Sequence, residues 1–270
     1  MPPDTIVCRP TPWFLFRAAV ITLMFGVFAI FFYKDGSTGY REKNEMFYLR
    51  QTFREAAARF ASMGGGDRLT PAEWRQFAEK QTVALPANRS VMPADSPRPY
   101  PWPAVLHDFE KMKPLQWEPM WIEYSGQRGL SDKVPDEPYD ERKILEQWVV
   151  FWICLVLALA GAFLLIRTVL RRLEIDENGL KTVDGRHVPF SAMRILDLRK
   201  WQTKGLAFLT YEKETGTVRT RIDGLTYGGF NKEQGEPAEQ LMNLLRSRFR
   251  GEIIEYAEVA AETKKPDEDV

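Results

Sequence analysis

Within residues 34–147, one cluster combines an imidazole with carboxylates: His107, Asp108 and Glu110. Such side chains transfer protons or bind a metal ion when they converge on one point. Either chemistry needs further ligands from elsewhere in the fold, and the whole sequence contains two histidines and two cysteines. We therefore expect His107 to be an ordinary surface side chain, and we expect no catalytic residue, metal or cofactor at this cluster.

The sequence contains no motif of the common enzyme classes, such as G-x-S-x-G, a Walker loop or H-E-x-x-H. Cys8 and Cys154 are too few for a disulfide framework. The 37 basic residues balance 37 acidic ones, which argues against a nucleic-acid binder that relies on bulk positive charge. Carboxylate chemistry stays open as an alternative, because acidic pairs always occur among so many acids. The sequence favours a non-catalytic protein.

A basic and aromatic group, Arg199, Lys200, Trp201 and Lys204, has a composition that suits an anionic membrane surface. The same residues also suit a solvated turn whose tryptophan packs inward. Both interpretations remain open, and we take the four residues as a candidate interaction surface.

Two long apolar segments, 13–33 and 148–166, decide the class of the protein. Each is long enough to cross the hydrocarbon core of a bilayer as a helix. A buried helix of a soluble protein is the alternative for the second, and a cleaved signal peptide for the first. The first segment ends in bulky aromatic residues, so we expect an uncleaved anchor. The predicted membrane-interface residues are Trp13, Arg17, Tyr33, Trp148, Trp152, Arg167, Arg171 and Arg172.

Two spans place both termini on one side of the membrane. The arginines closest to the apolar segments indicate that this side is cytoplasmic. The expected organisation is a short cytoplasmic N-terminus (1–12), a transmembrane helix (13–33), an extracytoplasmic domain (34–147), a second transmembrane helix (148–166), a cytoplasmic domain (167–255) and a disordered tail (256–270).

The extracytoplasmic domain begins with a predicted helix whose apolar residues alternate at spacings of three and four. This seam packs against the rest of the domain or, alternatively, against a second copy. Gly64, Gly65 and Gly66 are expected to end the helix. A second helix is expected to begin at Thr70, because Pro71 and Glu73 complete a capping box. The seam residues are Met46, Leu49, Phe53, Ala56, Phe60 and Met63.

A proline-rich stretch, 85–119, is expected to be extended and irregular. Trp102, Trp117 and Trp121 lie in or beside it. They are expected either to pack over the helices of their own domain or to form a docking surface for another protein or the bilayer. We take all three as candidate interaction residues.

The residues after Arg172 predict short strands joined by tight turns and closed by one helix. An Asn178-Gly179 hairpin, with φ > 0 expected at both positions, leads to the stretch 185–193 (GRHVPFSAM), and the helix is expected over 237–250. This pattern resembles the bacterial membrane-tethered pleckstrin-homology-like (PH-like) domains. The resemblance implies an interaction platform, although acidic residues outweigh basic ones in the first hairpin and argue against phosphoinositide capture there.

The fold class expected is therefore membrane α + β: two transmembrane helices, a mostly helical and irregular extracytoplasmic domain, and a PH-like antiparallel β-domain. The two-span layout is also similar to bacterial inner-membrane proteins without an assigned activity. We expect an adaptor or scaffold with membrane lipids and an unidentified protein as partners; a homo-oligomer is a further option. The alternative is an accessory or oligomeric subunit of a transport or channel complex.

Overall fold

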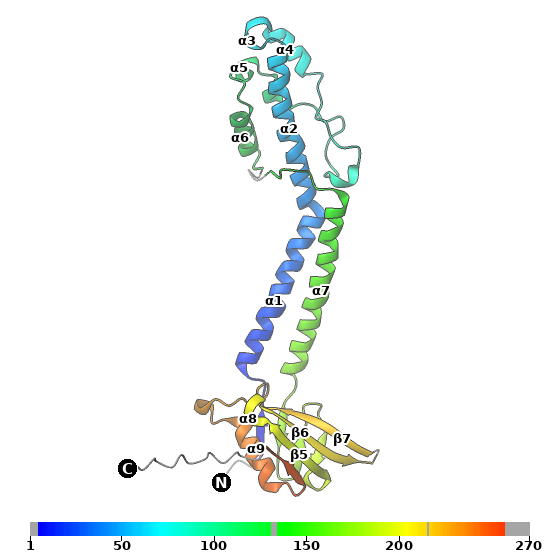
Figure 1. Ribbon diagram of the computed structural model, residues 1–270, viewed down its shortest axis with the longest axis vertical. Helices are drawn as coiled ribbons and strands as arrows, with labels where there is room; N and C mark the ends of the chain where they lie inside the picture. Colours follow the sequence, from blue (N-terminus) through cyan, green and yellow to red (C-terminus); the bar gives the residue numbers. More distant parts are fainter. Residues whose placement is uncertain (1–4, 131–133, 215, 257–270) are drawn as a thin grey trace, which may run out of the picture. The chain divides into compact units, whose positions relative to one another are not determined.

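The computed structural model describes residues 5–130, 134–214 and 216–256, and it divides into two compact units (Figure 1). The α+β unit comprises Met1–Met24 and Leu157–Val270, and the helical unit comprises Phe25–Val156. The boundaries fall within two long helices, α1 (Pro12–Lys34) and α7 (Glu141–Val169), so each helix contributes one end to each unit. The predicted tail (256–270) lies outside the described residues except for Tyr256.

Helices α1 and α7 are both long and apolar enough to span a membrane. Only 6% of the most apolar window of each is buried in the protein. A core helix of a soluble protein buries most of its apolar side chains, so this alternative does not fit α7. Helix α1 extends past its predicted segment by one residue at each end, and α7 extends seven residues before its segment and three after it.

In the helical unit, α1 continues through a π-helical turn, η1 (Asp35–Gly39), into α2 (Tyr40–Ser62). The predicted seam of α2 is buried from Met46 to Phe60, whereas Met63 follows the helix and is 37% exposed. Gly64 ends the helix with φ +102°, as expected. The short α3 (Gly65–Arg68) follows, and α4 (Pro71–Ala78) begins with the predicted capping box.

The proline-rich stretch is more helical than we expected. It contains η2 (Arg89–Val91), η3 (Ala104–His107) and α5 (Phe109–Met112), and α6 (Trp117–Gln127) begins just before Pro119. A proline in the first turn of a helix removes an N–H that has no partner within the helix, so Pro119 does not prevent α6. Helix α6 packs on the seam of α2, because Phe53 contacts Trp121 edge to face at 5.5 Å between ring centres.

The side chain of Asn44 connects three segments of the helical unit by hydrogen bonds. It is fully buried on α2. Its Nδ2 donates to the carbonyl oxygens of Val91 and Tyr139, each at 2.8 Å, and its Oδ1 accepts from the N–H of Tyr139. Val91 belongs to η2, and Tyr139 precedes α7, so one amide side chain joins the start of α7 to α2.

The α+β unit contains two four-stranded sheets, in the strand orders β1-β2-β3-β4 and β7-β6-β5-β8. The first sheet includes a strand that sequence analysis missed: β1 (Ile6–Cys8), from the predicted N-terminal segment, pairs antiparallel with β2 (Leu173–Ile175). Strands β3 (Gly179–Lys181) and β4 (His187–Pro189) complete it. The C-terminal domain is therefore built from both ends of the described chain.

The second sheet contains β5 (Met193–Lys200), β6 (Leu206–Lys213) and β7 (Gly216–Asp223), with α8 (Trp201–Lys204) between the first two strands. The predicted C-terminal helix is α9 (Pro237–Arg248), and its apolar face lies in the core of the unit. A further strand, β8 (Glu252–Ile254), follows α9 and pairs in parallel with β5.

The first hairpin forms where we predicted it, but the predicted conformation of its turn is wrong. Neither Asn178 nor Gly179 has a positive φ. The turn is held instead by the carboxylate of Asp176, which accepts from the N–H groups of Asn178 and Gly179 at 2.7 and 2.9 Å. Glycine is required at position 179 because a Cβ there would lie 2.2 Å from the carbonyl oxygen of Val188 on β4.

Short connectors join both apolar helices to the first sheet. Three residues separate β1 from α1, and another three separate α7 from β2. The first connector is fixed by hydrogen bonds from Thr11 to the carbonyl oxygens of Thr226 and Leu225. The second is fixed by ion pairs of Arg171 with Asp184 and of Arg172 with Glu174. Within the α+β unit, the two helices therefore start from neighbouring antiparallel strands.

Candidate functional site

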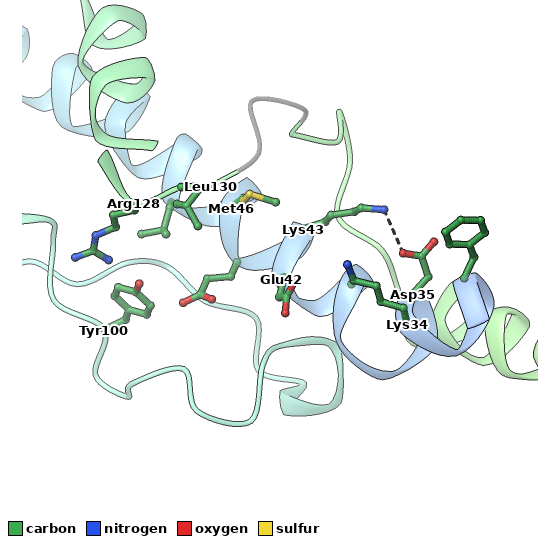
Figure 2. Close-up of a pocket in the computed structure, with 13 residues that line it drawn as sticks. Lys34, Asp35, Glu42, Lys43, Met46, Tyr100, Arg128 and Leu130 are labelled. Carbon is green, nitrogen blue, oxygen red and sulfur yellow. Dashed lines mark ion pairs between the residues drawn. The ribbon is translucent and has the colours of Figure 1, made fainter. Parts of the chain in front are cut away.

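A cavity of about 660 Å³ opens along one face of the continuous helix formed by α1, η1 and α2 (Figure 2). The opposite wall comes from Tyr100 and from the residues that follow α6. Its lining combines acidic, basic, aromatic and aliphatic side chains: Phe31, Lys34, Asp35, Gly39, Glu42, Lys43, Glu45, Met46, Leu49, Tyr100, Arg128, Gly129 and Leu130. Sequence reasoning missed this site, because its walls are far apart in the chain.

Glu45, Tyr100 and Arg128 form one end of the cavity. Burial raises the pKa of Glu45, and a side-chain hydrogen bond with Tyr100 and the charge of Arg128 oppose this rise. Burial, together with the nearby Glu45 carboxylate, raises the pKa of Tyr100 to about 12. Tyr100 therefore stays protonated at neutral pH and serves as a hydrogen-bond donor. Arg128 lies over the ring of Tyr124, at 4.8 Å from its centre.

At the other end, Lys43 holds several groups together. Its Nζ is 3.5 Å from a carboxylate oxygen of Asp35 and lies over the rings of Tyr40 and Tyr139, at 5.0 and 6.0 Å from their centres (Figure 2 shows the ion pair). The two rings stack on each other with centres 4.0 Å apart. This arrangement fixes the π-helical turn against the residues that lead into α7.

The lining of this cavity offers charged, polar and aromatic groups to a ligand. Lys43 is paired with Asp35, Glu45 shares a hydrogen bond with Tyr100, and Arg128 lies over the ring of Tyr124. Among the described residues there is no group of three or more histidine, cysteine or acidic side chains placed to hold a metal ion. The mixed lining suits a polar or zwitterionic group better than a purely apolar ligand.

The His107 cluster has structural tasks. The carboxylate of Asp108 caps α5 by accepting from the N–H groups of Glu110 and Lys111. Glu110 forms an ion pair with Lys113 at 2.7 Å. His107 is partly buried rather than an open surface residue, and its Nε2 has no hydrogen-bond partner among the described residues. The three residues line one surface pocket together with Arg75 and Glu79, but among the described residues they do not form a group that could hold a metal ion.

The predicted docking tryptophans are largely core residues, which corrects that candidate surface. Trp102 is 6% exposed and Trp121 is 4% exposed, and both belong to the core of the helical unit. Trp117 is half-buried against the same core, with the guanidinium of Arg50 at 5.7 Å from the centre of its ring. Of the two interpretations, packing over the helices of their own domain holds for these residues.

The four basic and aromatic candidates lie at the end of β5 and in α8, and only some of them are exposed. Trp201 is 2% exposed, contacts Phe230 edge to face and donates from Nε1 to Glu239, so it packs inward. Arg199 is paired with Asp197 through two side-chain hydrogen bonds, at 2.9 and 3.0 Å. Lys200 and Lys204 remain exposed. Two of the four candidate residues are therefore available to a partner without breaking an existing contact.

Most of the predicted membrane-interface residues lie at the ends of the apolar helices with their side chains exposed, including Trp13, Tyr33 and Trp152. Trp148 is different, because it is half-buried and its Nε1 donates to the carbonyl oxygen of Gly36 at 3.1 Å. The ring of Trp148 also meets Tyr33 edge to face. Trp148 therefore joins α7 to the π-helical turn.

Comparisons of the chain with models of protein families, with curated proteins and with solved structures gave no match.

Proposed function

We propose that this protein is a non-catalytic integral membrane adaptor, which connects an extracytoplasmic helical unit to a cytoplasmic α+β unit that binds another protein. The observation that supports this most directly is the attachment of both apolar helices to the paired strands β1 and β2 through connectors of three residues. Connectors of this length leave little freedom, so a shift of one helix relative to the other must act on the β1-β2 pair.

The membrane assignment rests on the two exposed apolar helices and on the aromatic and basic residues at their ends. The pairing of β1 with β2 supports an uncleaved first helix, because cleavage after α1 would remove a strand of the sheet. Both termini then lie on one side. We place this side in the cytoplasm of a bacterial cell because of the arginines near the helix ends.

The assignment of a PH-like fold is supported by the succession of antiparallel strands followed by α9. Two features depart from the pattern that suggested it: β1 comes from the N-terminal segment, and β8 follows the helix. We propose a PH-like domain that these two strands extend.

The test is to capture the full chain by a C-terminal tag from gently solubilised native membranes and to identify the co-purifying proteins. A matched pair of variants in β1, Val7→Pro and Val7→Thr, separates partner binding from nonspecific recovery. Proline at position 7 removes a backbone donor from β1, whereas threonine keeps the pairing with Glu174. We expect stoichiometric partners with the parent chain and with Val7→Thr, and their loss with Val7→Pro. A homo-oligomer without partners overturns the proposal.

A further inference from the structure

The loop between β7 and α9 carries an exposed leucine close to the first turn of α1. Leu225 is 56% exposed. Its carbonyl oxygen accepts from the Oγ1 of Thr11 at 3.1 Å, and the carbonyl oxygen of the next residue accepts from the N–H of Thr11 at 2.8 Å. Because α1 begins at Pro12, Leu225 lies next to the point where the helix leaves the α+β unit.

Further contacts fix this loop in place. The N–H of Gly228 donates to the carbonyl oxygen of Arg9 at 2.8 Å, and the N–H of Gly224 donates to that of Gly205 at 2.8 Å. Both of these glycines in the loop lie against other parts of the unit, since a Cβ at position 224 would be 2.7 Å from the buried ring of Trp201. The loop therefore packs on the buried ring of Trp201, whereas the side chain of Leu225 is exposed.

Basic residues lie on the chain segments next to Leu225. Lys204 adjoins Gly205, where a Cβ would lie 2.8 Å from the Cγ of Leu225, and Arg9 lies on the connector before α1. Burial raises the pKa of the Tyr227 hydroxyl, two residues after Leu225; the charges of Arg171 and Arg167 lower this pKa, and those of Asp223 and Asp184 raise it. Asp223 is paired with Arg221. Arg171 is paired with Asp184. Among the residues that the structure describes, Arg9, Arg167 and Lys204 have no carboxylate within ion-pair distance.

If α1 and α7 cross a bilayer, as in the proposed function on which this inference rests, the membrane surface meets the chain at the start of α1 and the end of α7. Trp13 and Leu170 lie at those two points and are 66% and 79% exposed. Leu225 is held to the residue before α1, so it lies at the same depth. A leucine among basic side chains is the composition of a surface that binds acidic lipid headgroups and inserts an apolar side chain.

We propose that Leu225, Arg9, Lys204 and Arg167 form a membrane-contact surface of the α+β unit, the Leu225 surface, and that its partner is a bilayer leaflet that contains anionic phospholipids. The contact fixes the unit against the membrane and so restrains the β1-β2 pair on which both helices act.

The test uses the full chain in lipid vesicles, with an environment-sensitive fluorophore on a single introduced cysteine. Cys154→Ala removes one native thiol. Cys8 is 1% exposed and burial raises its pKa to about 12, so it reacts poorly. Fluorophores are placed at Leu225→Cys, at Ile253→Cys as an exposed control on β8, and at Leu23→Cys in the middle of α1. Quenching by spin-labelled lipids is compared in phosphatidylcholine vesicles with and without phosphatidylglycerol.

We expect quenching at positions 23 and 225 and little at 253, with quenching at 225 increasing when phosphatidylglycerol is present. Lys204→Gln and Arg9→Gln should each lower the ratio of docked to undocked unit about fivefold. Lys213→Gln, an exposed lysine at the end of β6, should leave the ratio unchanged.

The three positions distinguish the two ways in which the idea can fail. Quenching at 23 without quenching at 225 overturns the Leu225 surface and leaves the membrane assignment intact. Absence of quenching at 23 overturns the membrane assignment itself. If Leu225→Cys is shielded from a water-soluble thiol reagent in native membranes but not in vesicles, a protein covers this position, and the lipid assignment is overturned.

Discussion

Replacement of Asn44 by alanine should destabilise the helical unit more than its single side chain suggests. Three polar groups lose their partner in Asn44→Ala: the buried carbonyl oxygen of Val91 and the partly buried carbonyl oxygen and N–H of Tyr139. A buried group left without a partner costs about 1–3 kcal/mol. A water molecule that enters the space left by the side chain recovers part of this cost. We therefore expect a loss of about 3–5 kcal/mol in the free energy of unfolding of the unit.

Thr52→Ala is the matched control. Thr52 lies on the same helix and is 2% exposed, and its hydroxyl donates to Tyr48 of its own helix. Its loss breaks no contact between segments, and we expect a cost of about 1 kcal/mol.

Thermal unfolding in mild detergent, followed by tryptophan fluorescence, measures the difference. Six of the eight tryptophans lie within residues 25–156, so the signal reports mainly the helical unit. Asn44→Ala should lower Tm by about 10–15 °C, and Thr52→Ala by a few degrees. Equal shifts for the two variants would refute the idea that Asn44 fastens η2 and the start of α7 to α2.

Three further predictions concern charge and close packing. Two hydrogen bonds from the Arg199 side chain lower the pKa of Asp197 to about 2, which stabilises the α+β unit at any pH above the ordinary aspartate pKa of about 4. Asp197→Asn should therefore cost about 1–2 kcal/mol of unfolding free energy at pH 7. Thermal melts followed by circular dichroism should show the difference between parent and variant vanishing as the pH falls toward 2. Burial raises the pKa of Glu45 and favours its protonated form in the folded state; Glu45→Gln should therefore raise Tm at pH 7, and an equal gain below pH 4 would contradict this reasoning. Gly179→Ala, which places a Cβ 2.2 Å from the carbonyl oxygen of Val188, should cost at least about 2 kcal/mol, against about 1 kcal/mol for Gly185→Ala, where φ is +78° and no atom lies within 4 Å. Cys8 is buried in the core of the same unit, so its thiol reacts with a maleimide faster when the unit is less stable. Equal reaction rates in the two glycine variants would contradict the clash at position 179.

The parts of the fold that sequence predicts well are those fixed by neighbouring residues. The seam of α2, the end of that helix at Gly64 and the capping box at Thr70 all depend on spacings of a few residues, and all are confirmed. The two long apolar helices are found for the same reason.

The parts that sequence missed depend on distant partners. Strand β1 has three residues, and its pairing with β2 joins Cys8 to Leu173, so local propensity carries no signal of it. Strand β8 is equally short and pairs with β5, from which β6, β7 and α9 separate it in the chain. The mixed-charge cavity brings Glu45 together with Tyr100 and Arg128, and its lining follows from the tertiary fold rather than from any motif.

The pairing of β1 with β2 has a consequence for biosynthesis. The ribosome makes β1 first, and its partner emerges 165 residues later (173 minus 8), after both apolar helices and the whole helical unit. At about 5–20 residues per second, this strand waits roughly 8–30 s before its sheet exists. If both helices cross a membrane, as we propose, a chain in which one of them fails to insert has its two strands on opposite sides and leaves the edge of β2 without its partner. Such an edge is a site of aggregation and of recognition by quality control. Completion of the sheet thus distinguishes a correctly inserted chain from a misinserted one.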